Sequence, residues 1–300
     1  MASAAEVLCI GESMVLVAPV SPAPLDRAEL FRLDVAGAES TVALYLEDLG
    51  IHSAWASRVG DDPLGRRVVE AIARRGVDTS HVRVDAVHPT GVYFKDPGAL
   101  ATAVHYYRRG SAASHMGTAD LGRLRLGEVQ IVHMSGITAA LSASCREMIH
   151  TLLGPGRGRP PLISFDVNYR PGLWPVGEAA PVLAELARAA DIVFVGQDEA
   201  EVLWGTNTPQ QVSELLGTAA CVVVKDGAVG ATQLSGGSSV FVPAEEVDVV
   251  EVVGAGDAFA AGYLAGALNE IGPEKSLAQG HRLAARALGS MRDYVSAVGD

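Results

Sequence analysis

Cysteine, aromatic residues and positive charge are all scarce in this 300-residue sequence. Its three cysteines, Cys9, Cys145 and Cys221, lie far apart and form no CxxC pair. We therefore expect three buried, reduced thiols and neither a disulfide framework nor a cysteine-based metal site. Lys and Arg total 23 against 35 Asp and Glu, a net charge of −12, which argues against general nucleic-acid binding. No apolar run reaches about 18 residues, so no membrane-spanning helix or membrane partner is expected.

The sequence does contain enough apolar material for a large core. Hydrophobic residues make up 49% of the chain and charged residues 19%, which excludes a disordered chain and predicts one domain over residues 1–300. The first residues, MASAAEVLCIGES, have no basic region ahead of their apolar run. They are expected to lead into the first strand and not to form a signal peptide, so a cytoplasmic protein is predicted.

Short apolar runs alternate with helical patterns in the second half of the chain. Strands are predicted at 129–134, 162–167, 191–195 and 220–225, and helices near 142–153, 178–189, 198–204 and 209–217. This alternation is typical of an α/β fold with a parallel sheet covered by helices. Ligands of such folds bind at the carboxyl ends of the strands. The loop-like segment at 154–161 is interpreted as a connection within the domain.

The first half of the chain is less regular. Strands are predicted at 7–10 and 54–59, and helices at 42–49 and 64–75. Residues 12–35 contain three prolines and are predicted to be irregular, whereas 90–95 and 103–109 are predicted to form two antiparallel strands.

The strongest chemical signal is the turn Gly254-Ala255-Gly256-Asp257, which precedes a helical pattern of small and apolar residues. The free N–H groups and dipole of such a helix start form an anion site. A carboxylate beside an anion site suits a base that accepts a proton from a hydroxyl attacking phosphorus. The alternative is a structural helix cap, since Asp is a favoured capping residue. A dinucleotide fingerprint fits less well because Phe259 occupies the place of the third glycine.

The longer string GAGDAFAAGYLAG resembles the second signature of the ribokinase-like (PfkB) carbohydrate kinases. Residues 36–50 (AGAESTVALYLEDLG) and 57–68 (SRVGDDPLGRRV) resemble further segments of that family, so the likeness covers nearly the whole chain. Residues 106–114 (YYRRGSAAS) and 164–175 (SFDVNYRPGLWP) resemble the branch of 2-keto-3-deoxygluconate kinases.

The resemblance implies a Rossmann-type three-layer α/β sandwich with a small β-sheet lid at about 12–35 and 90–109. It also implies ATP as phosphoryl donor, Mg²⁺ carried on the nucleotide, and a homodimer formed through the lid; whether a monovalent cation is needed stays open. Asp257 would be the base, and the N–H groups of Gly254, Ala255 and Gly256 would hold charge on the transferred group.

For the substrate, the resemblance implies a sugar or sugar acid. Arg108 and Arg170 suit a carboxylate, because a guanidinium can bind it with two parallel hydrogen bonds. Ordinary structural interpretations are a solvated strand residue for Arg108 and plain sheet aromatics for Tyr93 and Tyr106. The implied substrate residues are Gly37, Ala38, Thr41, Tyr93, Tyr106, Arg108 and Arg170.

The implied nucleotide contacts follow a predicted strand. VVVKDGAVGA at 222–231 resembles a nucleotide-lining segment of the family, although Asp226-Gly227 is also a good hairpin turn. Asp166 is interpreted as a structural residue that fixes Arg170 or its loop, and His281 as a surface residue of a helix and not an adenine contact. The implied nucleotide-binding residues are Asn168, Lys225, Gly227, Ala228 and Gly230, with Glu199 as an indirect metal contact.

Three positions depart from the family pattern. Thr41 stands where an Asn usually reaches sugar hydroxyls, and Glu251-Val252 stands where Asp-Thr usually precedes the turn. The usual Asn-x-x-Glu element is Gly196-Gln197-Asp198-Glu199, in which Gln197 could replace the missing Asn. A kinase of 2-keto-3-deoxygluconate or a close sugar acid is therefore the leading hypothesis. The alternatives are a kinase of another sugar such as fructose, a non-catalytic sugar- or nucleotide-binding relative and, last, a nucleotide-linked oxidoreductase.

Overall fold

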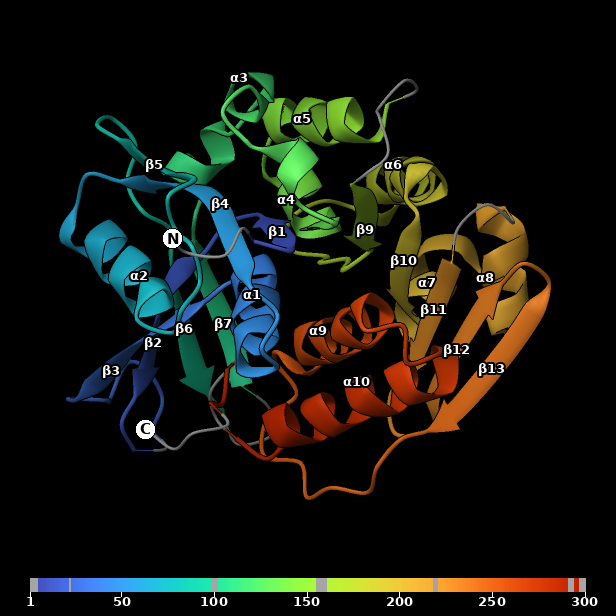
Figure 1. The fold of residues 1–300 in the computed structure, drawn as a ribbon. Coiled ribbons are helices and arrows are strands. Elements are labelled where there is room, and N and C mark those ends of the chain that lie inside the picture. The colour runs from blue at the N-terminus through green and yellow to red at the C-terminus, as the bar shows by residue number, and fades with distance from the viewer. Residues whose placement is uncertain are drawn as a thin grey trace.

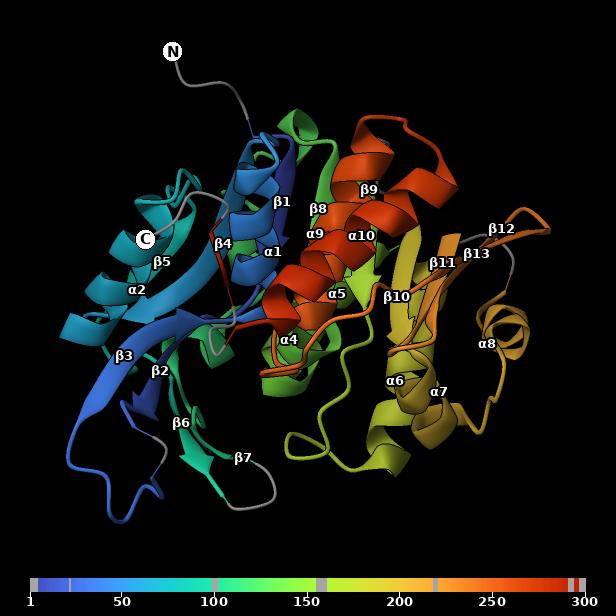
Figure 2. The ribbon, with the colours of Figure 1, turned by 90° about the horizontal axis from the view of Figure 1, so that it is seen from below.

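Two β-sheets and their covering helices form the protein (Figures 1 and 2). The computed structural model describes residues 5–21, 23–98, 102–154, 161–217, 221–290 and 294–296. Most of the predicted connection at 154–161 lies outside these residues. Among the residues described, no helix combines the length and the apolar character that a membrane span needs.

The large sheet has nine strands and confirms the predicted α/β class. Its order is β13 (Ser238–Pro243), β12 (Gly230–Ser235), β11 (Cys221–Asp226), β10 (Ile192–Gly196), β9 (Leu162–Asp166), β8 (Ile131–Ser135), β1 (Val7–Ile10), β4 (Ser53–Gly60) and β5 (Val82–Asp85). The strands from β11 to β5 are parallel, whereas β12 and β13 add an antiparallel edge. The alternative of a hairpin turn at Asp226-Gly227 is confirmed, although neither edge strand was predicted. This edge follows from the short turn after Asp226, which returns the chain along β11.

Helices cover both faces of this sheet and produce three layers (Figure 2). One face is covered by α1 (Ala38–Asp48), α2 (Pro63–Ala73), α9 (Ala255–Leu268) and α10 (Pro273–Leu288). The other is covered mainly by α4 (Gly136–Leu141), α5 (Ala143–Leu153), α6 (Val176–Ala189), α7 (Gln197–Trp204) and α8 (Pro209–Leu216). The short helix α3 (Thr118–Leu121) and the 3₁₀ helices Ala112–His115 and Leu126–Glu128 lie between β7 and β8 in the chain.

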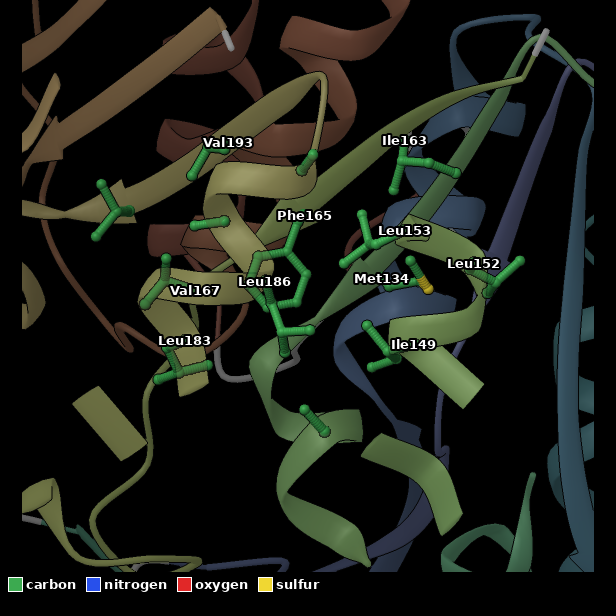
Figure 3. Close-up of a cluster of buried hydrophobic side chains, with 14 of the residues drawn as sticks. Met134, Ile149, Leu152, Leu153, Ile163, Phe165, Val167, Leu183, Leu186 and Val193 are labelled. Carbon is green, nitrogen blue, oxygen red and sulfur yellow. The ribbon is translucent and has the colours of Figure 1, made fainter. Parts of the chain in front are cut away.

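Each face of the sheet has its own apolar core. Figure 3 shows the side chains of α5 and α6 packed on β8, β9 and β10, with Phe165, Leu183 and Leu186 among those buried. On the other face, α9 is apolar on all sides and its residues from Ala258 to Gly266 are buried. A helix of this kind is held by packing and not by an amphipathic stripe, which fixes where its first turn lies.

The second sheet has the order β3 (Phe31–Ala36), β2 (Met14–Pro19), β6 (Val92–Pro97) and β7 (Thr102–Tyr107). The prediction of an irregular segment at 12–35 was wrong, because β2 and β3 form an antiparallel pair from Met14–Ala36 to Pro19–Phe31. The run MVLVA is apolar and buried, so it forms a strand, while Pro19 ends that strand and Pro24 lies in the connection.

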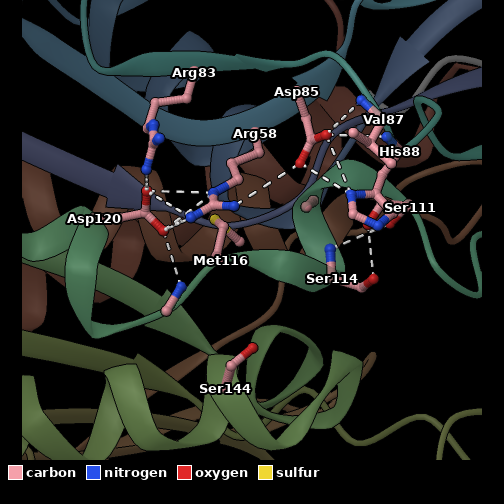
Figure 4. A network of polar contacts seen from close by, with 12 residues as sticks. Arg58, Arg83, Asp85, Val87, His88, Ser111, Ser114, Met116, Asp120 and Ser144 are labelled. Carbon is pink, nitrogen blue, oxygen red and sulfur yellow. Dashed lines mark hydrogen bonds and ion pairs between the residues drawn. The ribbon is translucent and has the colours of Figure 1, made fainter.

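An ion-pair network lies at the β5 edge of the large sheet (Figure 4). Arg58 Nη2 lies 2.8 Å and Arg83 Nη1 2.6 Å from the Asp120 carboxylate, which joins β4 and β5 to α3. Although burial opposes it, hydrogen bonds from the Val87 and His88 amides and the His88 ring lower the pKa of Asp85 to about 2. These contacts stabilise the packing of β4 and β5 against α3.

All three cysteines are free thiols in this structure. Cys9 and Cys145 are buried as predicted, whereas Cys221 is only partly buried at the start of β11. Burial raises the pKa of the Cys145 thiol to about 11, so this group stays protonated at neutral pH.

Candidate active site

Neighbouring parallel strands bring charged side chains to one edge of the large sheet. Asp166 ends β9, and the register sets Gly196 at the end of β10 beside Lys225 of β11. Lys225 Nζ lies 2.8 Å from Asp166 Oδ2, while Asp166 Oδ1 is buried without a hydrogen-bond partner in the described part of the chain. The interpretation that Asp166 fixes Arg170 was wrong: Asp166 pairs with Lys225, because β9 and β11 flank β10 on its two sides and these two side chains meet across it.

The Gly254–Asp257 turn begins α9 at this edge. Gly254 has φ 85°, a left-handed conformation that favours glycine, and it is the N-cap residue. The structural alternative of Asp257 as the helix cap is therefore wrong, since Asp257 lies inside the first turn. The Ala255 amide makes a long 3.5 Å contact with the Val252 carbonyl, and the Gly256 amide donates to no backbone carbonyl among the described residues. The turn thus presents N–H groups to an anion.

Lys225 adds a positive charge beside this turn. A Cβ atom placed on Gly256 would lie 3.4 Å from Lys225 Nζ, so the ammonium group sits next to the first amides of α9. The pKa of Lys225 is raised because the attraction of Asp166 and Glu199 outweighs the opposing effect of burial. The ammonium group is therefore fully charged at neutral pH, and the site combines a helix start with a cation.

The Asp257 carboxylate is tuned to exchange a proton near neutral pH. Burial, followed by repulsion from Asp166, raises the pKa of Asp257 to about 7, although Arg170 and Lys225 oppose the change. Asn168 Nδ2 lies 3.4 Å from Asp257 Oδ1 and has φ 41°, an unusual conformation that Asn tolerates better than most residues. A carboxyl with this pKa can act as a general base at physiological pH.

Arg170 and Glu199 lie at the rim of the same edge. Arg170 is half-exposed, and its Nη1 lies 3.5 Å from Glu199 Oε1. Glu199 also accepts a 3.0 Å hydrogen bond from the Gly196 amide, and burial raises its pKa. Gln197, which could have replaced the missing Asn of the family pattern, donates a 2.9 Å hydrogen bond to the Thr206 carbonyl. In this structure it therefore stabilises the loop after α7.

A second cluster lies where the two sheets meet. Arg108 is buried and its guanidinium pairs with the Glu12 carboxylate, with Nε at 2.6 Å from Oε2. Ser111 also donates to Glu12. The interpretation of Arg108 as a solvated strand residue was therefore wrong. Sequence reasoning missed Glu12, although an acidic residue directly after the first buried strand was a usable signal.

Two tyrosines lie in a row of contacts beside the Arg108–Glu12 pair: Tyr93 meets Tyr106, and Tyr106 meets Arg108. Tyr93 is buried, Tyr106 is half-exposed, and their rings lie 5.5 Å apart. The Arg108 guanidinium lies 5.7 Å from the centre of the Tyr106 ring, within range of a cation–π contact. The Arg108 Nη1 atom makes no hydrogen bond among the described residues and is not buried, so one edge of the guanidinium stays available to a ligand.

The start of α1 lies against this cluster. Gly37 is the N-cap, and a Cβ atom there would lie 2.4 Å from the Glu12 carbonyl oxygen, so only glycine allows this close approach. Ala38 is half-buried and Thr41 is buried one turn into the helix. Sequence reasoning also missed Glu39, which is fully buried and accepts hydrogen bonds from Ser135 and Thr138.

The residues predicted to line the nucleotide after β11 differ in their exposure to solvent. Gly227 and Ala228 are exposed in the turn between β11 and β12, whereas Gly230 is buried under Phe241. The interpretation of His281 as a surface residue was wrong, because it is buried with Nε2 3.1 Å from the Val242 carbonyl oxygen. His281 lies on the side of α10 that packs on α9, and its imidazole ring meets the Phe259 ring edge to face.

Comparison with known proteins then identifies the family. The sequence pattern of the pfkB family carbohydrate kinases matches residues 4–297. The chain belongs to this family. It is 36% identical over 287 residues to a 2-dehydro-3-deoxygluconokinase of Bacillus subtilis, covering 93% of this chain and 88% of that protein. This pfkB carbohydrate kinase also superposes on a PfkB protein of Polaromonas with a TM-score of 0.88, at 37% identity and with 96% and 97% of the two chains covered.

A solved complex of a further pfkB relative contains nucleotide. A sugar kinase of Pyrococcus horikoshii, solved in complex with ATP, superposes with a TM-score of 0.83 at 27% identity and covers 96% of this chain and 94% of that one. The family and these likenesses establish a carbohydrate kinase with a ribokinase-like fold.

Proposed function

We propose that this pfkB kinase transfers the terminal phosphoryl group of ATP to a hydroxyl of 2-dehydro-3-deoxygluconate, also called 2-keto-3-deoxygluconate, or of a close sugar acid. Two features of the molecule carry the proposal together. The Arg108 guanidinium has one edge open to a ligand, and the pKa of the Asp257 carboxyl, about 7, suits a general base. The name of the Bacillus subtilis relative and the ATP complex of the Pyrococcus horikoshii relative support the substrate and the donor.

In this proposal, Asp257 accepts the proton of the attacking hydroxyl. The hydroxyl oxygen forms a bond to the terminal phosphorus, the bond from that phosphorus to its bridging oxygen breaks, and ADP leaves. At pH 7 about half of Asp257 is ionised, since its pKa is about 7. The amides of Gly254, Ala255 and Gly256 stabilise charge on the transferred group, because they are fixed by the fold before the reaction starts.

The residues at the strand ends fit a nucleotide polyphosphate. Lys225 would neutralise phosphate charge beside Gly256, Asn168 would lie between sugar and phosphates, and the chain around Gly227, Ala228 and Gly230 would line the nucleotide. Within the described ranges, no group of three His, Cys, Asp or Glu side chains is placed to hold a metal ion. This fits Mg²⁺ that arrives bound to ATP, with Glu199 contacting it only indirectly. Bound Mg²⁺ would neutralise phosphate charge.

The sugar acid is proposed to bind between Gly37, Ala38 and Thr41 on one side and Tyr93, Tyr106 and Arg108 on the other. Arg108 would use its free edge for the substrate carboxylate, with Arg170 near the phosphates. A neutral sugar such as fructose is the second candidate, because Glu12 already balances the charge of Arg108. Thr41 also lacks the amide group of the Asn that the resemblance implies at that place.

The four-stranded sheet is proposed to act as the lid of a single domain and to pair across a homodimer. Exposed apolar side chains on its strands support an interface, among them Phe31, Leu33 and Tyr107. A lid over the sugar would exclude water, which competes as a phosphoryl acceptor. The three free thiols agree with a cytoplasmic location.

The test is ADP release from ATP and Mg²⁺ with 2-keto-3-deoxygluconate, its galactonate epimer, fructose, ribose and a nucleoside as acceptors, with and without added K⁺. Turnover on the keto acids alone would establish the sugar-acid kinase. Turnover on a neutral sugar alone would replace it with the second candidate. Nucleotide binding without turnover on any acceptor would favour a non-catalytic relative.

A further inference from the structure

A buried ion pair links the four-stranded sheet to the segment just before the Gly254–Asp257 turn. Lys95 Nζ on β6 lies 3.4 Å from Glu251 Oε2, and the two side chains are 3% and 11% exposed. The segment that carries Glu251 runs from β13 alongside α10 toward the four-stranded sheet (Figures 1 and 2). The pair therefore joins two parts of the chain that are about 150 residues apart in sequence.

Glu251 also organises the backbone that enters the turn. Its Oε1 accepts hydrogen bonds from the amides of Val252 at 2.9 Å and Val253 at 3.4 Å. Its own amide donates to the carbonyl of Leu288, the last residue of α10, at 3.2 Å. Val249, Val250 and Val252 are more than half exposed, so packing contributes little to the placement of this segment.

The same strand of the four-stranded sheet faces the candidate sugar site. Tyr93 and Lys95 are two residues apart on β6, so their side chains leave the same face of the strand. Tyr93 lies beside Tyr106, whose ring is near Arg108, whereas Lys95 reaches Glu251. One strand thus reaches the proposed sugar site through Tyr93 and the segment before the Gly254–Asp257 turn through Lys95.

We propose that the Lys95–Glu251 pair couples the four-stranded sheet to the catalytic turn, and that Glu251 is a positioning residue for phosphoryl transfer. Glu251 touches no reacting atom; it holds Val252 and Val253 so that Gly254 keeps its left-handed conformation and the amides of α9 face the phosphate. Lys95 holds Glu251 in place only while β6 is seated against the turn. This inference rests on the proposed kinase reaction.

The experiment compares K95M and E251Q with wild type and with the swapped pair K95E/E251K. The matched control is R32M, which removes the cation of the Arg32–Asp34 pair on β3 of the same sheet. Hydrogen exchange of residues 250–257 in the ligand-free protein is the first measurement. Turnover and the ratio of ADP formed to sugar phosphorylated are the second and third.

We expect faster exchange of residues 250–257 in K95M but not in R32M. Turnover of K95M and E251Q should fall about 100-fold, the loss expected when reacting groups are displaced by about 1 Å, with a smaller change in KM for ATP. More ADP should form without sugar phosphate, because water enters a loosened site. The swapped pair should recover part of the turnover.

Unchanged exchange in K95M, or turnover of K95M equal to that of R32M, would overturn the coupling. If wild type phosphorylates no sugar, the proposed function fails, and the exchange measurement alone decides whether the pair orders the turn. If K95M does not fold, the neutral double variant K95M/E251Q decides, since it removes both charges of this pair together. Low turnover in a folded double variant supports the coupling, and wild-type turnover contradicts it.

Discussion

Replacement of the proposed base by its neutral isostere, Asp257→Asn, should stabilise the ligand-free protein while it lowers turnover by orders of magnitude. The pKa of Asp257 is about 7, against an ordinary value of 3.8, because burial and Asp166 disfavour the ionised form. That difference corresponds to about 4 kcal/mol of destabilisation when the group is fully ionised in the folded protein. The figure is an upper limit, because the side chain keeps partial contact with water.

The sign of the pH dependence follows from proton binding. Between pH 3.8 and about 7 the folded protein keeps the proton on Asp257 while the unfolded chain releases it. Stability contributed by this group therefore falls as pH rises through that window, and the destabilisation is complete only above pH 7. The amide side chain of the Asp257→Asn variant carries no charge at any pH. The variant should be more stable than wild type by up to about 4 kcal/mol at pH 8 and by less than about 2 kcal/mol at pH 5.

The assay is urea unfolding of both proteins at pH 5 and pH 8 without ligands, followed by steady-state turnover. Turnover of the variant should fall by about 10²- to 10⁴-fold, the usual contribution of a general base, while ATP binding is largely retained. A stability difference that does not change between the two pH values would show that the pKa of Asp257 is not raised in the folded protein. Turnover close to wild type would show that it is not the base.

Four further outcomes are expected. The value of kcat/KM should fall about tenfold for each pH unit below about 7 and level off above it, because only ionised Asp257 accepts the proton; a level profile down to pH 5 would contradict this. Arg108→Ala should raise KM for a keto acid far more than KM for a neutral sugar, and an equal loss on both would remove the carboxylate argument. Burial lowers the pKa of His133 to about 4 from 6.5, so stability should decline by up to about 3 kcal/mol as pH falls through that window, and His133→Gln should remove this decline in urea titrations. Leu186→Ala should cost about 2–5 kcal/mol of unfolding free energy, since it opens a cavity in the core of Figure 3; a cost below about 1 kcal/mol would mean that the core collapses around the gap.

Local patterns in the sequence were sufficient for the central parallel strands β8 to β11, whereas the short parallel edge strand β5 was missed. The apolar runs ending near 134, 167, 195 and 225 all became strands β8 to β11 with boundaries shifted by one or two residues. Buried strands and their covering helices leave this regular trace because the period of apolar residues follows the local geometry. The patterns failed at β2 and β3, where three prolines in residues 12–35 led to the prediction of an irregular segment, although β2 pairs with both β3 and β6.

The sequence by itself also determined the chemistry that can occur at the turn before α9, since the small residues and Asp257 are contiguous and act through local backbone geometry. Only the tertiary structure decided the partners of each charge. Arg108 meets Glu12, Lys225 meets Asp166 and Lys95 meets Glu251 across separations of 59 residues or more. Such pairs are set by strand order and register, which bring distant residues together. No period or spacing along the chain records that arrangement.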